Sequence, residues 1–257
     1  MKNGETATHQ DRRLLDIFNN LANNIENFQQ DQLLQAAKRM ADAISDDRLI
    51  YIYGGGGHTT LVMQELFWRA GGLANLCPMI DFAIHPVTPA YMYLAHERQH
   101  NIGNATVDYY GVSEKDVIII FHSYGFNPPT IDCALEAKRR NAIVIGVSSK
   151  DWDNKTPKDF PLRHQSGKHL SGLSDIYIDN YVPFGDAVIE VDGLDQPVTG
   201  ISSSIDFYIA HRLEMECIKE CVRRGVVPPV WSSANIAGGD IKNDLLRKKY
   251  NSRVKFL

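Results

Sequence analysis

Apolar residues recur every three or four positions through the first 45 residues, which is the spacing of one face of an amphipathic helix. The pattern runs from Leu14 to Ile44 and is interrupted by polar residues at 23–24 and 29–32. A polar break of this kind ends one helix and offers a cap for the next. We therefore expect two helices that form an N-terminal arm over residues 1–45, ahead of one domain over 46–257.

Later in the chain, short apolar runs alternate with segments of helical spacing. Three runs lack polar alternation, which is typical of strands buried on both faces of a parallel sheet: 49–53, 117–121 and 142–147. Two shorter runs are candidates for a fourth and a fifth strand, 176–178 and 187–191. Helical spacing covers 61–70, 130–140 and 202–223. The order strand, helix, strand predicts an α/β fold, and the polar segment 150–173 with its two prolines predicts a long loop.

The first apolar run leads directly into four glycines and then into His58, Thr59 and Thr60. Glycines remove the Cβ atoms that would keep a ligand away from the backbone, and they let successive N–H groups point the same way. The first turn of the following helix adds free N–H groups and the positive end of its dipole. We expect this junction to bind an anion, through Gly55, Gly56, Gly57, His58, Thr59 and Thr60.

Composition and charge narrow the class of protein. The 257 residues carry a formal net charge of −4, which disfavours a nucleic-acid surface because phosphate backbones require clustered Lys and Arg. No apolar run approaches the roughly 20 residues of a membrane span, and Met1–Glu5 lacks the apolar core of a signal peptide. Four scattered cysteines favour reduced packing residues. We expect a cytoplasmic enzyme or binding protein.

A possible metal site lies at His96-Glu97-Arg98-Gln99-His100, which has the His-Glu-x-x-His spacing of zinc metalloproteases. Asp81 and His85 lie nearby in the sequence and carry side chains that bind metals. The alternative is a polar helix without a metal, and we expect no metal and no organic cofactor.

A set of motifs appears in a fixed order along most of the chain: Gly55–Thr59, Glu65–Leu73, Arg163–Lys168, Asp179-Asn180, Gly185-Asp186, Pro228–Val230, Ser233–Asn235 and Gly238–Asp240. In this order the chain resembles SIS (sugar isomerase) domain proteins, and more closely the uncharacterised bacterial SIS proteins grouped as phosphosugar-binding. The resemblance implies a three-layer αβα sandwich with a five-stranded parallel flavodoxin-like sheet. It also implies a homodimer or homotetramer, and a sugar-phosphate site at the carboxyl ends of the strands.

The loop after the second strand departs from that family. Similar proteins carry Ser-x-Ser-Gly there, whereas this chain reads His122-Ser123-Tyr124-Gly125. A bulky phenol cannot replace a small hydroxyl in a tight phosphate cradle without moving the ligand. The ligand of this loop could therefore carry a sulfonate or no anion, and the candidate binding residues are His122, Ser123, Tyr124 and Asn127.

Three side chains are candidates for the chemistry. An aldose–ketose isomerase needs a base that moves a proton between C2 and C1, and we expect Glu65 to be that base. The alternative for Glu65 is an ion pair with Arg69, four residues later. His58 or His211 would open the sugar ring.

Arg163 and Lys168 lie in the expected loop 150–173, where cationic side chains could close over an anionic substrate. The sequence favours a cofactor-independent aldose–ketose isomerase that acts on an anionic sugar, either a sugar phosphate or a sulfo-sugar. The alternatives are an amino-sugar phosphate lyase or etherase, a non-catalytic sugar-phosphate sensor and, in fourth place, a metal hydrolase.

Overall fold

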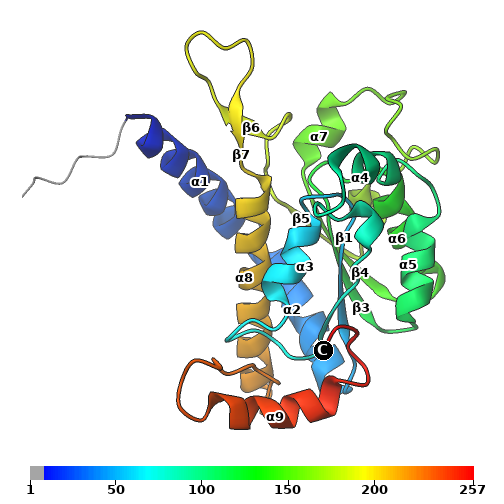
Figure 1. Ribbon diagram of the computed structural model, residues 1–257, viewed down its shortest axis with the longest axis vertical. Coiled ribbons are helices and arrows are strands. Elements are labelled where there is room, and N and C mark those ends of the chain that lie inside the picture. The colour runs from blue at the N-terminus through cyan, green and yellow to red at the C-terminus, as the bar shows by residue number, and fades with distance from the viewer. Residues whose placement is uncertain (1–8) are drawn as a thin grey trace, which may run out of the picture.

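A parallel sheet of five strands forms the centre of the computed structural model, which describes residues 9–257 (Figure 1). The strands lie in the order β2, β1, β3, β4, β5. Their bounds are β1 Ile50–Gly54, β2 Leu76–Pro78, β3 Val117–Phe121, β4 Ile143–Ser148 and β5 Ile176–Asp179. Helices cover both faces of this sheet. The expected three-layer αβα fold with a five-stranded parallel sheet is therefore confirmed.

The two expected N-terminal helices are also confirmed, as α1 (His9–Phe28) and α2 (Gln30–Ser45) with a break at Gln29. In Figure 1, α1 extends away from the sheet. α2 instead places Leu33, Ala37 and Met40 in the core against the sheet. The first eight residues of the expected arm, which include Met1–Glu5, lie outside the described residues.

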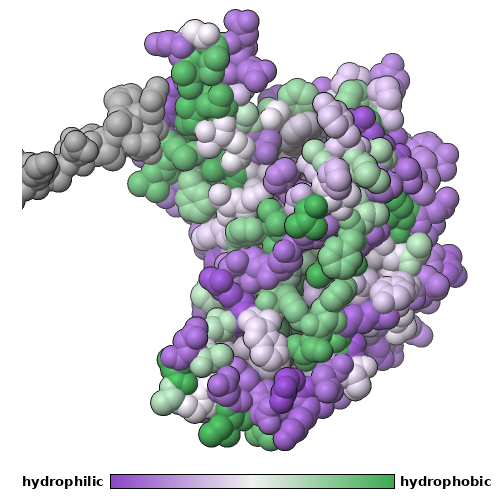
Figure 2. Space-filling model, in the orientation of Figure 1, coloured by the Kyte–Doolittle hydropathy of each residue, from purple (hydrophilic) through white to green (hydrophobic). Residues whose placement is uncertain are grey.

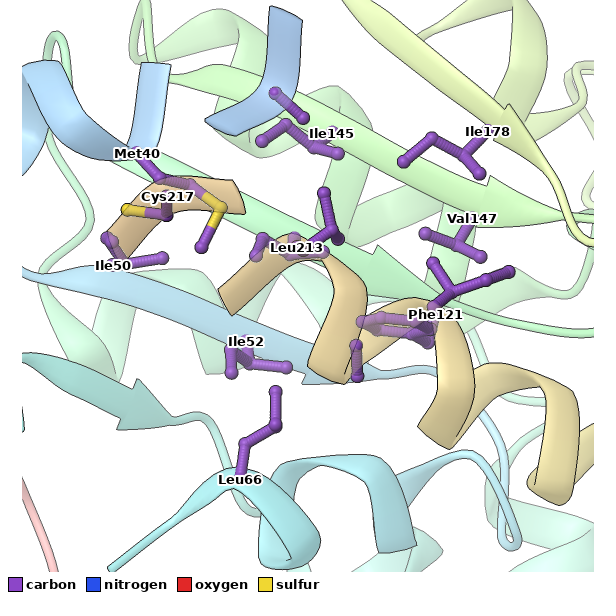
Figure 3. Close-up of a cluster of buried hydrophobic side chains, with 14 of the residues drawn as sticks. Met40, Ile50, Ile52, Leu66, Phe121, Ile145, Val147, Ile178, Leu213 and Cys217 are labelled. Carbon is purple, nitrogen blue, oxygen red and sulfur yellow. The ribbon is translucent and has the colours of Figure 1, made fainter. Parts of the chain in front are cut away.

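Different helices cover the two faces of the sheet, because successive strand residues point to opposite faces. On one face, Met40 of α2 and Leu213 of α8 (Ser202–Arg223) belong to the same buried cluster as Ile52 and Phe121 (Figure 3). This face also receives α3 (Thr60–Leu66), whereas α5 (Ile102–Tyr110) and α6 (Pro128–Arg139) cover the other face. The remaining elements are α4 (Ala90–His96), α7 (Lys150–Lys155), α9 (Gly239–Tyr250) and 3-10 turns at Phe82–Ile84 and Leu170–Gly172.

The expected fifth strand, 187–191, does not join the central sheet. Residues Ala187–Ile189 form β6, which pairs antiparallel with β7 (Val198–Gly200) in a separate hairpin. The hairpin projects beside α1 and carries part of the apolar surface in Figure 2. The fifth strand is β2, which the sequence did not reveal because it has three residues and ends in a proline. A proline is tolerated there because β2 is an edge strand.

The segment 150–173 is not the continuous loop that its composition predicts. It begins with α7, where Ser149 caps the helix by accepting a hydrogen bond from the N–H of Asp151 at 3.1 Å. A 3-10 turn at Leu170–Gly172 closes it, with Leu170 buried against the sheet. The expected helix 61–70 is shorter than predicted, because Phe67 is extended and Trp68 has a φ of +55°.

The four cysteines are free and buried, as predicted: Cys77, Cys133, Cys217 and Cys221. Among the helices of residues 9–257, none combines the length and the apolar character that crossing a membrane requires.

The close contact of α5 and α6 depends on Gly103. A Cβ added to Gly103 would lie 2.2 Å from the carbonyl oxygen of Pro129 and 2.4 Å from the backbone N of Cys133. Because neither backbone atom can rotate away, we expect Gly103→Val to lower the free energy of unfolding by about 3 kcal/mol, measured in urea. Ala105→Val on the exposed side of the same helix controls for the helix propensity of valine. Equal losses in the two variants would contradict the packing explanation.

Candidate functional site

A hollow of about 210 Å³ opens at the carboxyl ends of the central strands. It lies where the strand order reverses, since β1 pairs with β2 on one side and with β3 on the other. Ligands of open α/β sheets bind at this kind of crevice. We call this hollow the strand-end pocket, and its lining residues are Gly56, Gly57, His58, Thr59, Tyr93, Leu94, Glu97, His122, Ser123, Tyr124, Trp152, Asp186 and Ser202.

The N–H groups of the three expected anion-binding glycines already have partners inside the protein. The N–H of Gly55 donates to the carbonyl of Phe121, and that of Gly56 donates to Oγ1 of Thr59. The N–H of Gly57 donates to Oε2 of Glu97 at 3.0 Å. Thr60, like Thr59, holds the loop itself, because its hydroxyl donates to the carbonyl of Gly57. The loop is therefore a hydrogen-bonded turn, and its glycine N–H groups are not free donors.

Gly56 has no room for a Cβ, because the side chains of His122 and Glu97 converge on it. A Cβ at this position would lie 2.7 Å from Nε2 of His122 and 3.1 Å from Oε2 of Glu97. Both groups therefore approach one point of the backbone from different elements. A proton donor and a carboxylate thus flank one point of the cavity, which is an arrangement that binding and catalytic sites use.

His122 is a neutral hydrogen-bond donor. Its ring is buried, and burial lowers its pKa to about 3. Nδ1 accepts a hydrogen bond from the N–H of Gly125 at 3.1 Å, so the single ring proton of the neutral form lies on Nε2. That nitrogen faces the glycine loop. His122 therefore lines the strand-end pocket with a defined donor, the N–H of Nε2.

Glu97 is the pocket residue that sequence reasoning placed elsewhere, as a possible metal ligand. It follows the end of α4 and is 8% exposed. Burial raises its pKa, and the N–H of Gly57 partly offsets this effect. Neither periodicity nor spacing in the sequence indicates that Glu97 lines this pocket, because Glu97 reaches it only through the contact of its loop with the glycine loop.

Aromatic rings form one wall of the strand-end pocket. Tyr124 meets His122 edge to face, with ring centroids 4.1 Å apart, and lies 5.3 Å from Trp152. Trp152 in turn lies 4.8 Å from Phe184. Burial raises the pKa of Tyr124, so its hydroxyl keeps its proton. The phenol thus takes the space in which the family resemblance implies a small hydroxyl.

Glu65 and His211 meet on the seam between α3 and α8, which lie side by side in Figure 1. Nε2 of His211 lies 3.2 Å from Oε1 of Glu65, and its Nδ1 lies 3.5 Å from Oε2 of Glu214. These two carboxylates, Glu214 first, raise the pKa of His211 and favour its charged form. Glu65 also lies 3.3 Å from Arg69, so the alternative ion pair exists alongside the contact with His211.

The Glu65–His211 pair and the strand-end pocket are distinct parts of one side of the molecule. His211, Glu214 and Arg69 line a second hollow of about 300 Å³, which shares no lining residue with the strand-end pocket. Both hollows border α8, and they lie beyond opposite ends of α3: Thr59, its N-cap, lines the strand-end pocket, and Arg69, after its last residue, lines the second hollow. Ser202 begins α8 at the strand-end pocket, and His211 lies nine residues further along.

The other predicted site residues divide into pocket residues and supporting residues. His58 is exposed at the pocket, and Ser123 lines it. Asn127 is buried beneath the loop, where its Nδ2 donates to the carbonyls of Gly55 at 2.7 Å and Glu97 at 3.3 Å. Asn127 therefore joins the two segments that bring Glu97 to the glycine loop.

Arg163 and Lys168, the expected lid cations, do not line the strand-end pocket. The side chain of Arg163 is 3% exposed, forms an ion pair with Asp153 at 2.8 Å and stacks on Phe126. Lys168 is exposed on the surface loop. The structure thus uses Arg163 to hold the 150–173 segment together.

The His-Glu-x-x-His spacing does not form a zinc site. His96 ends α4 with its Nδ1 against the carbonyl of Ala83, while His100 lies in the following loop beside His164. His100, Asp132 and His164 place ligand-type atoms within 4.8 Å of one another. Nδ1 of His164 accepts the N–H of Ser166, so its Nε2 proton points to Asp132 at 3.0 Å. This group is a hydrogen-bonded histidine–aspartate pair.

The sequence of the chain matches a domain model and curated bacterial proteins. Residues 15–149 match the sequence model of the SIS domain. A UPF0309 protein of Halalkalibacterium halodurans is 33% identical over 225 residues, which cover 88% of each chain. A UPF0309 protein of Thermoanaerobacter pseudethanolicus is 32% identical over 251 residues, which cover 95% of this chain and 100% of that one.

Two solved structures share the fold at low identity. A phosphoheptose isomerase from Francisella tularensis superimposes with a TM-score of 0.54 and 13% identity, over 84% of this chain and 100% of that one. A phosphoheptose isomerase from Neisseria gonorrhoeae gives a TM-score of 0.54 and 16% identity over the same shares. At these identities the similarity establishes the fold alone.

Proposed function

Since the chain belongs to the SIS domain family, and within it to the UPF0309 proteins, we propose that it is an aldose–ketose isomerase. Membership of the family supports a sugar-phosphate isomerase or sugar-binding role. The contact between Glu65 and His211 carries the proposal of a reaction. These residues are 146 positions apart in the sequence, yet the fold brings a carboxylate within 3.2 Å of an imidazole whose pKa is raised. They are the base and the acid that an enediol mechanism requires.

The pair can perform the whole proton transfer without a cofactor. Glu65 accepts the proton of C2 from the open-chain aldose while His211 gives its proton to the carbonyl oxygen at C1, which yields the enediol. Glu65 then returns the proton to C1, and His211 recovers a proton from the C2 hydroxyl as the ketone forms. Atoms and charges balance, because each group ends as it began.

The substrate would extend from the strand-end pocket to the pair. Glu65 lies five residues after the start of α3 at Thr60, a distance of about 7.5 Å along a helix. An open hexose chain has a similar length. We place C1 and C2 of the sugar at Glu65 and His211, with its other end toward the strand-end pocket. His58, exposed at the pocket, is placed to assist opening of the ring.

Proton NMR in D₂O tests the proposed reaction. Hexoses, hexose 6-phosphates and 6-sulfo hexoses would each be incubated with the protein. An isomerase incorporates deuterium at C2 and produces the ketose. If some sugars bind but none exchanges its C2 proton, the isomerase proposal is wrong and a sugar-binding sensor takes its place.

A further inference from the structure

The strand-end pocket has the wrong charge for a phosphate group. Its described lining residues include the carboxylates of Glu97 and Asp186 and contain no Lys or Arg. Asp186 caps α8, with Oδ1 accepting the N–H groups of Ile201 at 3.0 Å and Ser202 at 2.8 Å. That carboxylate is thus matched by the amino end of a helix. Glu97 has no such match.

Glu97 occupies the position that a bound anion would need. Its Oε2 accepts the N–H of Gly57, which is the kind of donor that a phosphate oxygen uses in a glycine loop. Among residues 13–257, whose side chains are described, no Lys, Arg or His lies within ion-pair distance of Glu97. The hydroxyl of Tyr124 also lowers the pKa of Glu97 through a hydrogen bond, and Arg98 and His58 add longer-range attraction. A phosphate placed at this loop would therefore meet a carboxylate that has hydrogen bonds but no ion pair among the described residues.

The groups that remain are suited to hydroxyls and to the apolar face of a sugar ring. His122 offers a neutral N–H donor, and Glu97 offers a carboxylate acceptor on the other side of Gly56. Tyr93, Tyr124 and Trp152 supply aromatic surface in the same pocket. Small-molecule sites commonly combine aromatic walls with a few precisely positioned polar groups. None of the described polar side chains that line the strand-end pocket is a Lys or an Arg.

We propose that the strand-end pocket binds the uncharged, hydroxyl-bearing end of an unphosphorylated sugar, and that Glu97 excludes phosphate from it. This inference rests on the proposed function for the identity of the ligand as a sugar. The sequence predicts a sugar with an anionic group at one end. We infer instead that the end of the sugar in the pocket is a free hydroxymethyl group. Glu97 is then a specificity-determining residue that would hydrogen-bond a sugar hydroxyl, and Tyr124 fills the remaining space of the phosphate cradle.

Binding measurements on matched sugar pairs test this inference. The probes are D-glucose, D-mannose and D-fructose, each with its 6-phosphate, titrated calorimetrically into the full-length protein. At least one parent sugar should bind about tenfold or more tightly than its 6-phosphate, since like charges side by side are strongly unfavourable. A 6-phosphate that binds more tightly than its parent, or the failure of every parent sugar to bind, would overturn the inference.

The variant Glu97→Gln identifies the residue responsible. The amide keeps the shape and can still accept the N–H of Gly57, but it carries no charge. The ratio of affinities should shift toward the 6-phosphate by about tenfold, because the repulsion is removed. Tyr124→Ser, which opens the cradle without changing its charge, should shift the ratio less. If Glu97→Gln weakens parent and phosphate equally, Glu97 only supports the pocket and does not select the ligand.

The outcomes separate this inference from the proposed reaction. Glu114→Gln, in the turn at the amino end of the central strand β3, is the control for the loss of one carboxylate away from the pocket. C2 exchange observed only with 6-phosphates would keep the isomerase and overturn the inference. Selective binding of unphosphorylated sugars without exchange would keep the inference and overturn the isomerase.

Discussion

Replacing Glu65 with glutamine should slow C2 proton exchange by a factor on the order of 10² to 10⁴, the usual contribution of a general base. Glutamine has the shape of the glutamate and can still contact His211, so the packing of α3 on α8 should survive. Only the ability to accept the C2 proton is removed. Deuterium incorporation at C2, followed by proton NMR on a sugar that the wild type exchanges, measures the loss. An unfolding curve recorded in parallel checks that the variant is folded.

Two further variants define what this result means. Glu114→Gln should exchange at the wild-type rate, because Glu114 is an exposed residue in the turn before β3. Arg69→Gln removes the other partner of Glu65 and tests whether that ion pair matters for the rate. If Glu65→Gln exchanges within threefold of the wild type, Glu65 is not the base. The buried carboxylate of Glu97 would then be the next residue to test.

The contribution of Asp206 to the stability of the protein should fall as the pH rises from about 4 to about 7, opposite in sign to the contribution of buried His122, whose pKa is lowered. Asp206 lies on α8 and is fully buried, which raises its pKa from 3.8 to about 7. Its Oδ1 accepts a hydrogen bond from Nδ2 of Asn180 at 2.8 Å, while Oδ2 has no partner among the described residues. The nearby charge of Asp186 also favours the protonated form.

The Asp206 contribution falls with rising pH because the folded protein holds the proton of this carboxyl more tightly than the unfolded chain does. Below the unfolded pKa both states bind the proton, so the contribution of Asp206 to stability is fully present. Between the two pKa values the unfolded chain has lost the proton while the folded protein keeps it, so rising pH favours unfolding. Over this window the loss reaches about 4 kcal/mol, from a shift of about three pKa units. Above about pH 7 this group adds no further slope.

Asp206→Asn tests the assignment. Asparagine does not titrate and can still accept the hydrogen bond from Asn180. The difference in unfolding free energy between the variant and the wild type should therefore rise steadily from pH 4 to pH 7, measured in urea. Asp192→Asn, at an exposed position, should leave the wild-type slope unchanged. Parallel stability curves for wild type and Asp206→Asn would show that Asp206 is not the group that titrates.

Patterns of apolar residues along the chain predicted those helices and strands whose type depends on their own residues. The strand 117–121 and the helix 202–223 match β3 and α8 at both ends. An uninterrupted apolar run suits a strand buried on both faces, and a repeat of three and four residues suits one helix face. The placement of Glu65 on a helix after the glycine loop was accessible for the same reason, since helical spacing is local.

The sequence by itself determined the α/β class, the main strands and helices, the glycine loop and the candidates Glu65, His58 and His211. Only the tertiary structure brought Glu65 to His211, turned Glu97 into the strand-end pocket and gave the loop N–H groups internal partners. It also made Leu76–Pro78 the edge strand in place of 187–191. The physical reason is that strand order and contacts between distant side chains depend on how whole elements pack, which the pattern along a single element does not encode.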